Sequence, residues 1–415
     1  MKEKFKLTAL EKSWILYDVG NSAFILLVAT LVPIFFNALA KTAGLNEDLY
    51  LSYWGYAGSI ATILVAILGP ICGTLADRKL KKQFFLIAML VGVAGCALLG
   101  FAPGWLAFLC VFILARVGYS SSLVFYDSML PEVTSDERMD KVSSMGYAFG
   151  YIGSVIPFIV CLILVLMPDT FGLTTGSAMV IAFLITALWW VACTVPLLRR
   201  YRQTAFVSTE KSPLLDSFRQ LGRTIRDAKK EKHIFLYLLA FSFFIDGVYT
   251  IIDMATAYGT ALGLDTTGLL LALLVTQIVA FPCSIAFGRL SAKYDTGLLI
   301  KVCIIAYTCV VLFAVFMVSQ WQFWLLAVLV GMFQGGIQAL SRSYLGKIIP
   351  PEKSGEYFGL FDICGKGASF LGTMIVSVGS QLTGSANVGV GSLIVLFIVG
   401  FVLFRVSYKE GVITE

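Results

Sequence analysis

The stretch Trp14–Phe24, WILYDVGNSAF, places a carboxylate inside an apolar segment of the chain. It opens a run of roughly two dozen mostly apolar residues, long enough to cross a lipid bilayer as a helix. An ionised Asp at the centre of a bilayer costs about 2.5–3.5 kcal/mol on insertion scales. We therefore expect Asp18 to face a water-filled space, a partner cation or a coupling ion.

The composition is that of an integral membrane protein. Of the 415 residues, 58% are hydrophobic and 13% are charged, and the mean hydropathy is +0.87, whereas soluble proteins carry about 25% charged residues. The nine cysteines lie mainly in apolar segments and lack a C-x-x-C spacing, so they predict neither a disulfide scaffold nor a metal site. The single histidine, His233, lies in a basic segment without a nucleophile–base set. The sequence thus predicts no cofactor, no metal and no enzyme.

Twelve apolar spans of about 20 residues predict an all-α membrane protein with twelve transmembrane helices. The predicted spans are 14–40, 53–75, 83–102, 105–129, 143–167, 177–198, 234–258, 266–288, 298–318, 322–345, 357–380 and 388–407. Seven segments on one face, with Arg342 counted among them, carry every Lys and Arg except Lys41, Arg116 and Lys366. The positive-inside rule places that face and both termini in the cytoplasm. The net charge of +6 therefore reflects topology, and nucleic acid is not an expected partner.

The spans fall into two sets of six around one long polar segment, a pattern typical of two-half transporters. We predict an N-terminal six-helix bundle (1–198), a basic linker (199–233) with an amphipathic helix that starts at Ser212-Pro213, and a C-terminal six-helix bundle (234–415). The halves also resemble each other. The motif Pro131, Gly146, Gly153 recurs at a constant offset as Pro350, Gly365, Gly372, which indicates a parallel duplication.

Four stretches resemble known transporters. Residues 73–82, GTLADRKLKK, resemble the loop 2–3 signature of the major facilitator superfamily, G-x-x-x-D-[RK]-x-G-[RK]-[RK], with Leu80 in place of its second glycine. The stretches 14–24, 125–154 (FYDSMLPEVTSDERMDKVSSMGYAFGYIGS) and 335–373 resemble the vacuole-effluxer-like branch, named for a fungal vacuolar amino-acid exporter linked to autophagy. Val19 and Gly20 depart from the Trp-Ala expected there. The resemblance implies the major facilitator fold and an alternating-access carrier.

Several charged residues that fall inside the predicted spans are candidates for function: Asp18, Arg116, Asp246, Asp253, Asp362 and Lys366. At about 3 kcal/mol each, lipid exposure of all six would exceed a typical net stability of 5–15 kcal/mol, so we expect them inside the bundle. Arg116 near the midplane is suited to hold a carboxylate or phosphate, or else to pair with a structural carboxylate. Asp246 and Asp253 suit a protonation site or an ammonium group; alternatively they neutralise Arg116 and Lys366.

Other polar residues of the spans have two readings. The i,i+4 spacing of Asp362 and Lys366 fits an intrahelical pair as well as a substrate role. Tyr17, Asp18 and Asn21 either line the cavity or belong to a gate at its cytoplasmic mouth. The i,i+4 pairs Tyr147/Tyr151 and Gln334/Gln338 are suited to line a polar cavity, while the glutamines also fit polar contacts between helices.

The gate is predicted from the signature stretch. Asp77 resembles the superfamily's gate aspartate, and we expect its carboxylate to cap a helix N-terminus and hold the cytoplasmic side closed. Gly73 and Arg78 belong to the same motif, although Arg78 also serves as positive-inside charge. Glu132 and Arg138 are predicted to form a further latch.

Together these features predict a secondary active transporter of a small polar solute, with an amino acid or related zwitterion as substrate. Arg116 would bind the carboxylate and Asp246 or Asp253 the ammonium group, with a coupling proton on Asp18 or Asp246. No P-loop occurs, which argues against direct drive by ATP. We expect a monomer in a bacterial inner membrane. The alternatives are an exporter of drugs or amphipaths, and a non-transporting scaffold or sensor that acts through 199–233.

Overall fold

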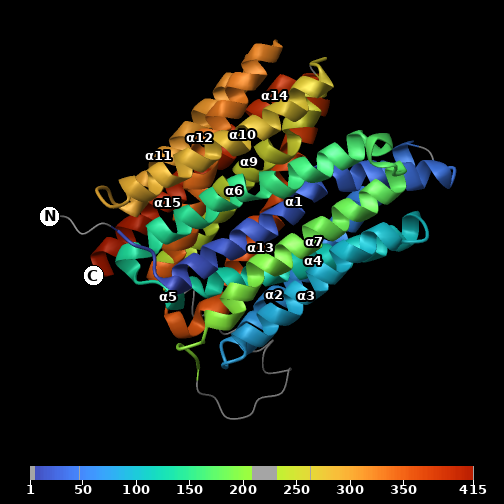
Figure 1. Ribbon diagram of the computed structural model, residues 1–415. Coiled ribbons are helices and arrows are strands. Elements are labelled where there is room, and N and C mark those ends of the chain that lie inside the picture. The colour runs from blue at the N-terminus through green and yellow to red at the C-terminus, as the bar shows by residue number, and fades with distance from the viewer. Residues whose placement is uncertain (1–4, 46, 208–230, 262, 415) are drawn as a thin grey trace.

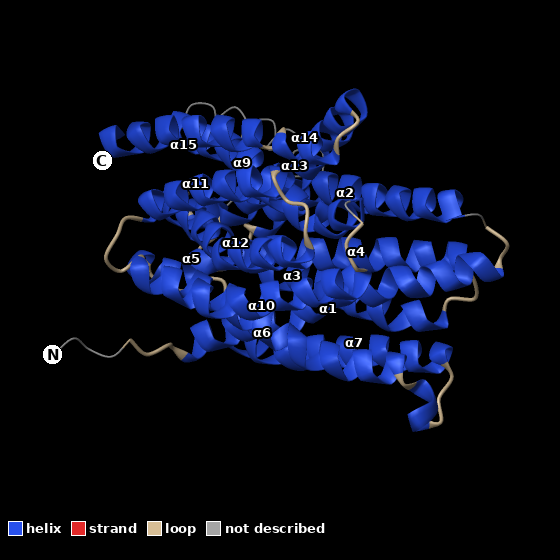
Figure 2. Ribbon diagram, turned by 90° about the horizontal axis from the view of Figure 1, so that it is seen from above, coloured by secondary structure: helices blue, strands red, loops and turns tan. Residues whose placement is uncertain are grey.

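The computed structural model describes residues 5–45, 47–207, 231–261 and 263–414, and their regular structure is entirely helical (Figure 2). The first half contains α1 (Ala9–Thr42), α2 (Glu47–Ala76), α3 (Lys81–Leu98), α4 (Trp105–Ser128), the short α5 (Leu130–Val133), α6 (Asp136–Leu166) and α7 (Thr175–Arg200). The second half contains α9 (Lys232–Ala261), α10 (Thr266–Leu290), α11 (Thr296–Val315), α12 (Gln320–Ile348), α13 (Ser354–Thr383), α14 (Ala386–Gly391) and α15 (Ile394–Thr414).

Eleven helices of the described chain are long and apolar enough to cross a membrane, with α14 and α15 forming one span. Helix α13, 30 residues long, is the twelfth long helix of the bundle. The predicted all-α fold with twelve transmembrane helices is therefore confirmed.

Several helices begin before the predicted spans, and polar caps fix the starts of α1, α7 and α11. At the start of α1, Thr8 Oγ1 accepts a hydrogen bond from Glu11 N at 3.1 Å, and Glu11 Oε2 accepts one from Thr8 N at 2.7 Å. This capping box starts the helix at Ala9, before the predicted start at residue 14. Asp295 caps α11 in the same way, by accepting from Leu298 N at 2.9 Å. Hydropathy marks only the apolar part of a helix, so it misses these polar first turns.

The two halves have separate hydrophobic cores. One buried cluster draws its residues from 14–201, and the other draws its residues from 234–404. In Figure 1 the blue-to-green helices of the N-terminal half (α1–α7) lie beside the yellow-to-red helices of the C-terminal half (α9–α15). The two cores support the proposed bundles 1–198 and 234–415. The predicted amphipathic helix of the linker lies in 208–230, outside the described residues.

The halves touch most extensively along two helix pairs, α2 with α13 and α6 with α10, and α12 also packs against α6. Glycines permit the close approach. A Cβ on Gly73 of α2 would collide with the Gly355 carbonyl group of α13, and one on Gly288 of α10 would lie 2.8 Å from Ser144 Cβ of α6. A Cβ on Gly355 would likewise lie 2.6 Å from the Gly73 carbonyl oxygen. Because real Cβ atoms do not approach backbone this closely, the α2–α13 contact depends on glycine at both residue 73 and residue 355.

We predict that Gly73→Val opens the end of the bundle where both termini lie. The added side chain must displace α13 from α2, whereas Gly58→Val on the same helix meets open space. Spin labels at the exposed Glu137 and Glu352, one in each half, placed in a cysteine-free variant, should move apart in Gly73→Val and stay in place in Gly58→Val. An unchanged distance distribution in Gly73→Val would contradict this account of the α2–α13 contact.

Candidate functional site

The polar contacts between the halves gather at one end of the bundle, which we call the termini end. It is the end where α1 begins and α15 finishes, and α5 lies there as well (Figure 1). Three carboxylate centres, on Asp77, Asp18 and Asp140, join the N-terminal half to the C-terminal half here.

The first centre is Asp77, which caps α13. Asp77 Oδ1 accepts a hydrogen bond from Gly355 N at 2.8 Å, and Oδ2 accepts one from Glu356 N at 3.0 Å. These are donors that the first turn of a helix leaves without intrahelical partners, and the helix dipole favours an anion there. The fully buried Lys81 donates to Ser354 Oγ at 2.8 Å and lies 3.8 Å from Asp77. The contact has the geometry expected of a closed gate.

Burial dominates the protonation of Asp77, which lies in the loop between α2 and α3. Burial raises the pKa of its carboxyl to about 6, against the opposing effects of Lys81 and the two backbone N–H groups. The nearby Glu132 carboxylate acts in the same direction as burial.

Glu132 gathers the segments around this centre but stays within the N-terminal half. Its carboxylate accepts hydrogen bonds from Lys81 Nζ at 2.7 Å, Tyr201 Oη at 2.8 Å and the backbone N–H groups of Thr204 and Ala205 at 2.6 and 3.1 Å. It thus fastens the start of the linker to the gate loop. Its only route to the other half is through Lys81.

Arg138 lies against the start of α1, and Arg78 lies in the loop that carries Asp77. Arg138 donates to Glu11 Oε2 at 2.6 Å and to the Lys6 carbonyl at 2.9 Å, contacts that hold the start of α1 against α6. These contacts lie within the N-terminal half and fasten the start of α1 to α6. Arg78 is half-buried beside Asp77.

The second centre is Asp18, which faces Arg342 of the other half. Arg342 of α12 is only 2% exposed, and its Nη1 lies 2.9 Å from Asp127 Oδ1 of α4 and 3.4 Å from Asp18 Oδ2 of α1. Its Nε donates to Ser143 Oγ at 3.0 Å. The guanidinium carbon also lies 4.6 Å from the ring centre of Trp14. One arginine of the C-terminal half is therefore shared by two carboxylates of the N-terminal half.

The third centre is Asp140 of α6. Its Oδ2 accepts from Lys347 Nζ at 2.7 Å and from Thr296 Oγ1 at 2.6 Å, while Oδ1 accepts from Ser343 Oγ at 2.6 Å. It lies on the α6 side of the bundle, whereas Asp77 serves the α2–α13 side. The two sides of the closed end thus use different chemistry despite the repeated sequence.

Sequence reasoning missed Arg342, Asp140 and Lys347. Arg342 lies inside the predicted span 322–345 but was counted as a loop charge of the basic face. Treating it as a charge within a span would have made it a candidate partner for Asp18. Asp140 and Lys347 lie inside the stretches 125–154 and 335–373, but only the packing of α6 against α12 shows that they meet.

The remaining signature residues support this centre from within the N-terminal half. Tyr17 is fully buried, donates or accepts a hydrogen bond with Ser122 Oγ at 2.6 Å, and packs against Tyr126 and Phe85. Asn21 Nδ2 donates to Asp18 Oδ1 at 3.4 Å. Tyr17 therefore belongs to the core rather than to a solvent-accessible surface.

Farther from the termini end, a second group of polar residues meets between the halves. Arg116 of α4 is half-exposed, and it is the charge that acts on the Asp253 carboxylate of α9. Asp253 is exposed to solvent although protein atoms surround it densely, which is the setting of a side chain in a concave surface. Tyr249 of α9 lies within electrostatic range of Asp127, Asp253 and Asp362.

The predicted i,i+4 pairs lie next to this group. The rings of Tyr147 and Tyr151 on α6 are 6.1 Å apart, and both side chains are half-exposed and within electrostatic range of Tyr249. Gln334 of α12 is buried and Gln338 is half-buried. The Lys366 side chain lies outside the described residues, so its predicted pairing with Asp362 stays a prediction.

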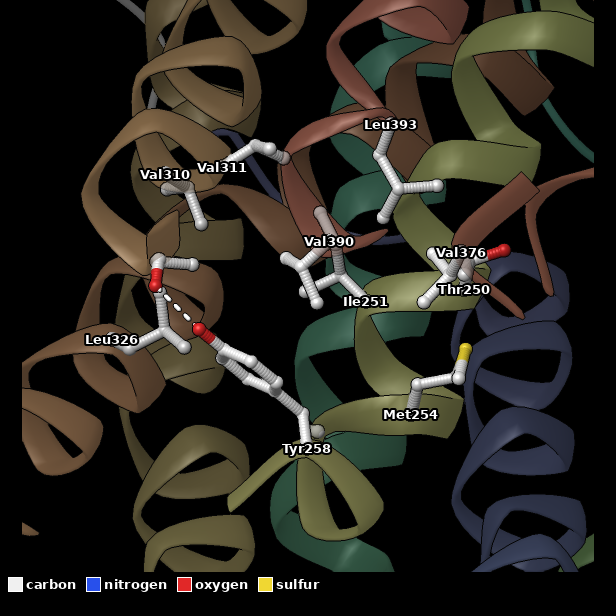
Figure 3. A pocket seen from close by; sticks show the side chains of 12 residues that line it. Thr250, Ile251, Met254, Tyr258, Val310, Val311, Leu326, Val376, Val390 and Leu393 are labelled. Atoms are coloured by element: carbon white, nitrogen blue, oxygen red, sulfur yellow. Dashed lines mark hydrogen bonds between the residues drawn. The ribbon is translucent and has the colours of Figure 1, made fainter. Parts of the chain in front are cut away.

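Two features lie inside the C-terminal half. Asp246 of α9 is completely buried beside Gly372 of α13 and does not share the surroundings of Arg116. An apolar cavity lies among α9, α11, α12, α13 and α14 (Figure 3). Within the described part of the chain, no group of three or more His, Cys, Asp or Glu side chains is arranged to hold a metal ion.

A sequence profile identifies the family of this chain. The profile described as "Vacuole effluxer Atg22 like" matches residues 9–412, which is nearly the entire sequence. The chain belongs to the Atg22-like family. The resemblance drawn from stretches 14–24, 125–154 and 335–373 is thereby confirmed.

Relatives of this Atg22-like chain are transporters or autophagy proteins by name. It is 41% identical over 411 residues to the "Uncharacterized MFS-type transporter YxiO" of Bacillus subtilis strain 168, covering 98% of this chain and 96% of that one. It is 24% identical to "Autophagy-related protein 22" of Coccidioides immitis, covering 84% of this chain and 70% of that one. The chain is a membrane transporter of the major facilitator type.

Solved structures show the same fold at low identity. The human organic anion transporter MFSD10 matches with a TM-score of 0.69 at 14% identity, covering 95% of this chain and 98% of that chain. The transporter FucP in its outward conformation matches with a TM-score of 0.70 at 14% identity, covering 96% and 97%. The Atg22-like chain therefore has the major facilitator fold.

Replacing Arg342 with Gln should destabilise the protein strongly. The change leaves the carboxylates of Asp18 and Asp127 without their shared cation, and breaking a buried ion pair in this way costs about 3–5 kcal/mol. The apparent unfolding temperature in detergent should fall in Arg342→Gln and largely recover when Asp18→Asn and Asp127→Asn are added. Failure of the triple variant to recover would show that the arginine acts through packing instead of charge.

The closed termini end should be favoured by acid. Because burial raises the pKa of Asp77 to about 6 in the closed state, that state binds a proton more tightly than one in which the carboxylate is hydrated, with a pKa of about 3.9. The closed population, followed with the 137/352 label pair, should grow as the pH falls through about 6 and shrink as it rises. Asp77→Asn should remove this dependence, with Lys81 and Glu132 left in place. A dependence retained in Asp77→Asn would assign it to another group.

Proposed function

We propose that this protein is a secondary active transporter of a small zwitterion, most simply an amino acid. The observation that carries the proposal is that Arg116 from one half lies within electrostatic range of Asp253 from the other. Asp253 is exposed and Arg116 is half-exposed, whereas Asp18 and Arg342 are sequestered in the contacts of the closed end. A ligand that entered between the halves would meet a cation on one side and a carboxylate on the other.

The chemistry of this pair matches both ends of an amino acid. The guanidinium of Arg116 presents a planar fork of N–H donors to a carboxylate. The Asp253 carboxylate can accept hydrogen bonds from an ammonium group. Tyr249 and Tyr147 nearby supply hydroxyl groups and aromatic faces, which also attract cations. A bound zwitterion would replace the attraction between Arg116 and Asp253 and hold both halves at once.

The side of the membrane from which the substrate enters is inferred from the closed termini end and from the distribution of basic residues. The contacts of Asp77, Arg342 and Asp140 close the termini end, so the Arg116–Asp253 pair is reached from the opposite end. We propose that the termini lie in the cytoplasm, because the basic segments gather on their side, and that this state faces outward. The similarity to a structure described as outward supports this orientation.

We propose a proton gradient as the drive and a monomer in a bacterial inner membrane as the working form. The sequence contains no P-loop for ATP. The vacuolar effluxer named in the family description supports transport of metabolites rather than signalling. An amphipath exporter is the second candidate, favoured by the apolar cavity of Figure 3. A scaffold or sensor acting through 199–233 would lose its function on deletion of 204–228, whereas a transporter would keep its activity in purified form.

The proposal predicts amino-acid exchange by the purified protein. Proteoliposomes preloaded with unlabelled amino acids should take up an equimolar mixture of tritiated amino acids. Arg116→Ala and Asp253→Asn should each reduce uptake at least tenfold, because one lost charge-assisted hydrogen bond is worth about 1.5–3 kcal/mol. The matched controls Lys41→Ala and Asp169→Asn, which replace exposed charges outside this group, should transport normally.

Uptake that is unchanged in Arg116→Ala and Asp253→Asn would overturn the assigned binding roles. Uptake of a lipophilic cation in place of the amino-acid mixture would favour the amphipath exporter.

A further inference from the structure

Asp246 is a buried carboxylate that the proposed binding group does not use. Its side chain is completely buried in α9, and Oδ2 has no hydrogen-bond partner. Oδ1 receives a long hydrogen bond of 3.4 Å from Thr250 Oγ1, and the Gly372 backbone supplies the remaining donor. An ionised carboxylate in an apolar interior normally gathers several donors or a cation. Asp246 has too few donors to be a stable anion in this state.

The charged and titratable groups around Asp246 do not compensate for this. On its own helix the nearest charge toward the far end is Asp253, and the described charges of α13 are Glu356 and Asp362; all three are acids. On α15, Phe397 packs against Gly247, and on α11 the Tyr307 ring stacks on Phe397. No charged group acts on the Asp246 carboxyl within the described residues. The site therefore favours a neutral acid.

Thr250 connects Asp246 to the apolar cavity. Its hydroxyl donates to Asp246, and the same residue lines the cavity together with Met254 and Tyr258 farther along α9 (Figure 3). Because α9 runs from the termini end toward the opposite end, these residues lie on the side of Asp246 that faces away from the closed gate. The apolar walls keep the site poor in water, which again favours the protonated form.

Helix α13 connects Asp246 to the gate. Its first turn is held by Asp77 at the termini end, and its Gly372 packs directly on Asp246 and Thr250. A Cβ at Gly372 would lie 3.0 Å from Asp246 Oδ1, so a small movement of α13 changes the surroundings of the carboxyl. Release of α13 from Asp77 therefore changes both the gate and the surroundings of Asp246.

We propose that Asp246 is the site that binds the transported proton, protonated while the termini end is closed and deprotonated when it opens. This rests on the proposed function for its role in transport. The Asp246 carboxylate takes up a proton reaching it from the end opposite the termini and forms a neutral acid. When α13 moves, the O–H bond breaks, the proton passes to water at the termini end, and the carboxylate remains. Inward movement of protons then drives the cycle.

The binding of the proton can be tested without any substrate. Infrared spectra of the full-length Asp77→Asn variant in liposomes, which lacks the Asp77 carboxyl that titrates near pH 6, are recorded from about pH 5 to about pH 9. They should show a protonated carboxylic-acid C=O band that disappears as the pH rises, that loses intensity when Asp246→Asn is added and that is unchanged when Asp253→Asn is added. A band unchanged by Asp246→Asn would overturn the proposal, as would spectra without such a band before that change.

Thr250→Val provides a second variant if Asp246→Asn fails to fold. It removes the hydroxyl that donates to the ionised form while it keeps the side-chain volume, so the disappearance of the band should shift toward higher pH. An unshifted or downward-shifted band would contradict the assignment to Asp246.

The link to transport is tested by proton flux with the tritiated amino-acid mixture. Wild-type proteoliposomes that contain no amino acids should acidify internally during net uptake, and Asp246→Asn should not. Net uptake of amino acids without proton flux in the wild type would overturn the proposed role of Asp246. Absence of uptake and of exchange in the wild type would instead overturn the proposed substrate, and the infrared result would stand by itself.

Discussion

The closed state depends on one arginine shared between two carboxylates. Arg342 enters the N-terminal half from α12 and forms ion pairs with both Asp18 and Asp127. Burial makes this interaction all-or-none, because an arginine removed from water is stable only while its carboxylates are in place. Trp14 and Tyr147, whose rings flank the guanidinium, are arranged around it. This buried ion-pair group therefore favours one relative position of the two halves.

The carboxylates of Asp77 and Asp140 join the halves by different kinds of contact. Asp77 accepts from backbone N–H groups at the start of α13, so its contact depends on the helix rather than on a particular side chain. Asp140 accepts from Lys347 and Ser343 of α12 and from Thr296 of α11, so its contact depends on three side chains. One contact of the closed end is thus backbone-based and the other is side-chain-based.

Much of the fold could be predicted because apolar length and the distribution of basic residues are local properties of the sequence. The helix starts were less predictable, since Thr8 and Asp295 act through polar caps outside the apolar runs. Asp77 was predictable because a motif fixes both its place and its partner, a helix N-terminus. The partner of Asp18 was not, because a residue such as Arg342 looks the same in sequence whether it faces water or a buried carboxylate. Which charges meet depends on how the two halves pack.

The contacts of the termini end also determine the order in which parts of the protein can fold during synthesis. Lys81 and Ser354 are 273 positions apart, and Asp18 and Arg342 are 324 positions apart. During synthesis, Asp18 and Lys81 cannot form these contacts until α12 and α13 have been made. Lys81 can first serve as a topology signal for its own hairpin and only later leave solvent. The closed end is consequently among the last regions to form, and its closure reports that both halves have been inserted.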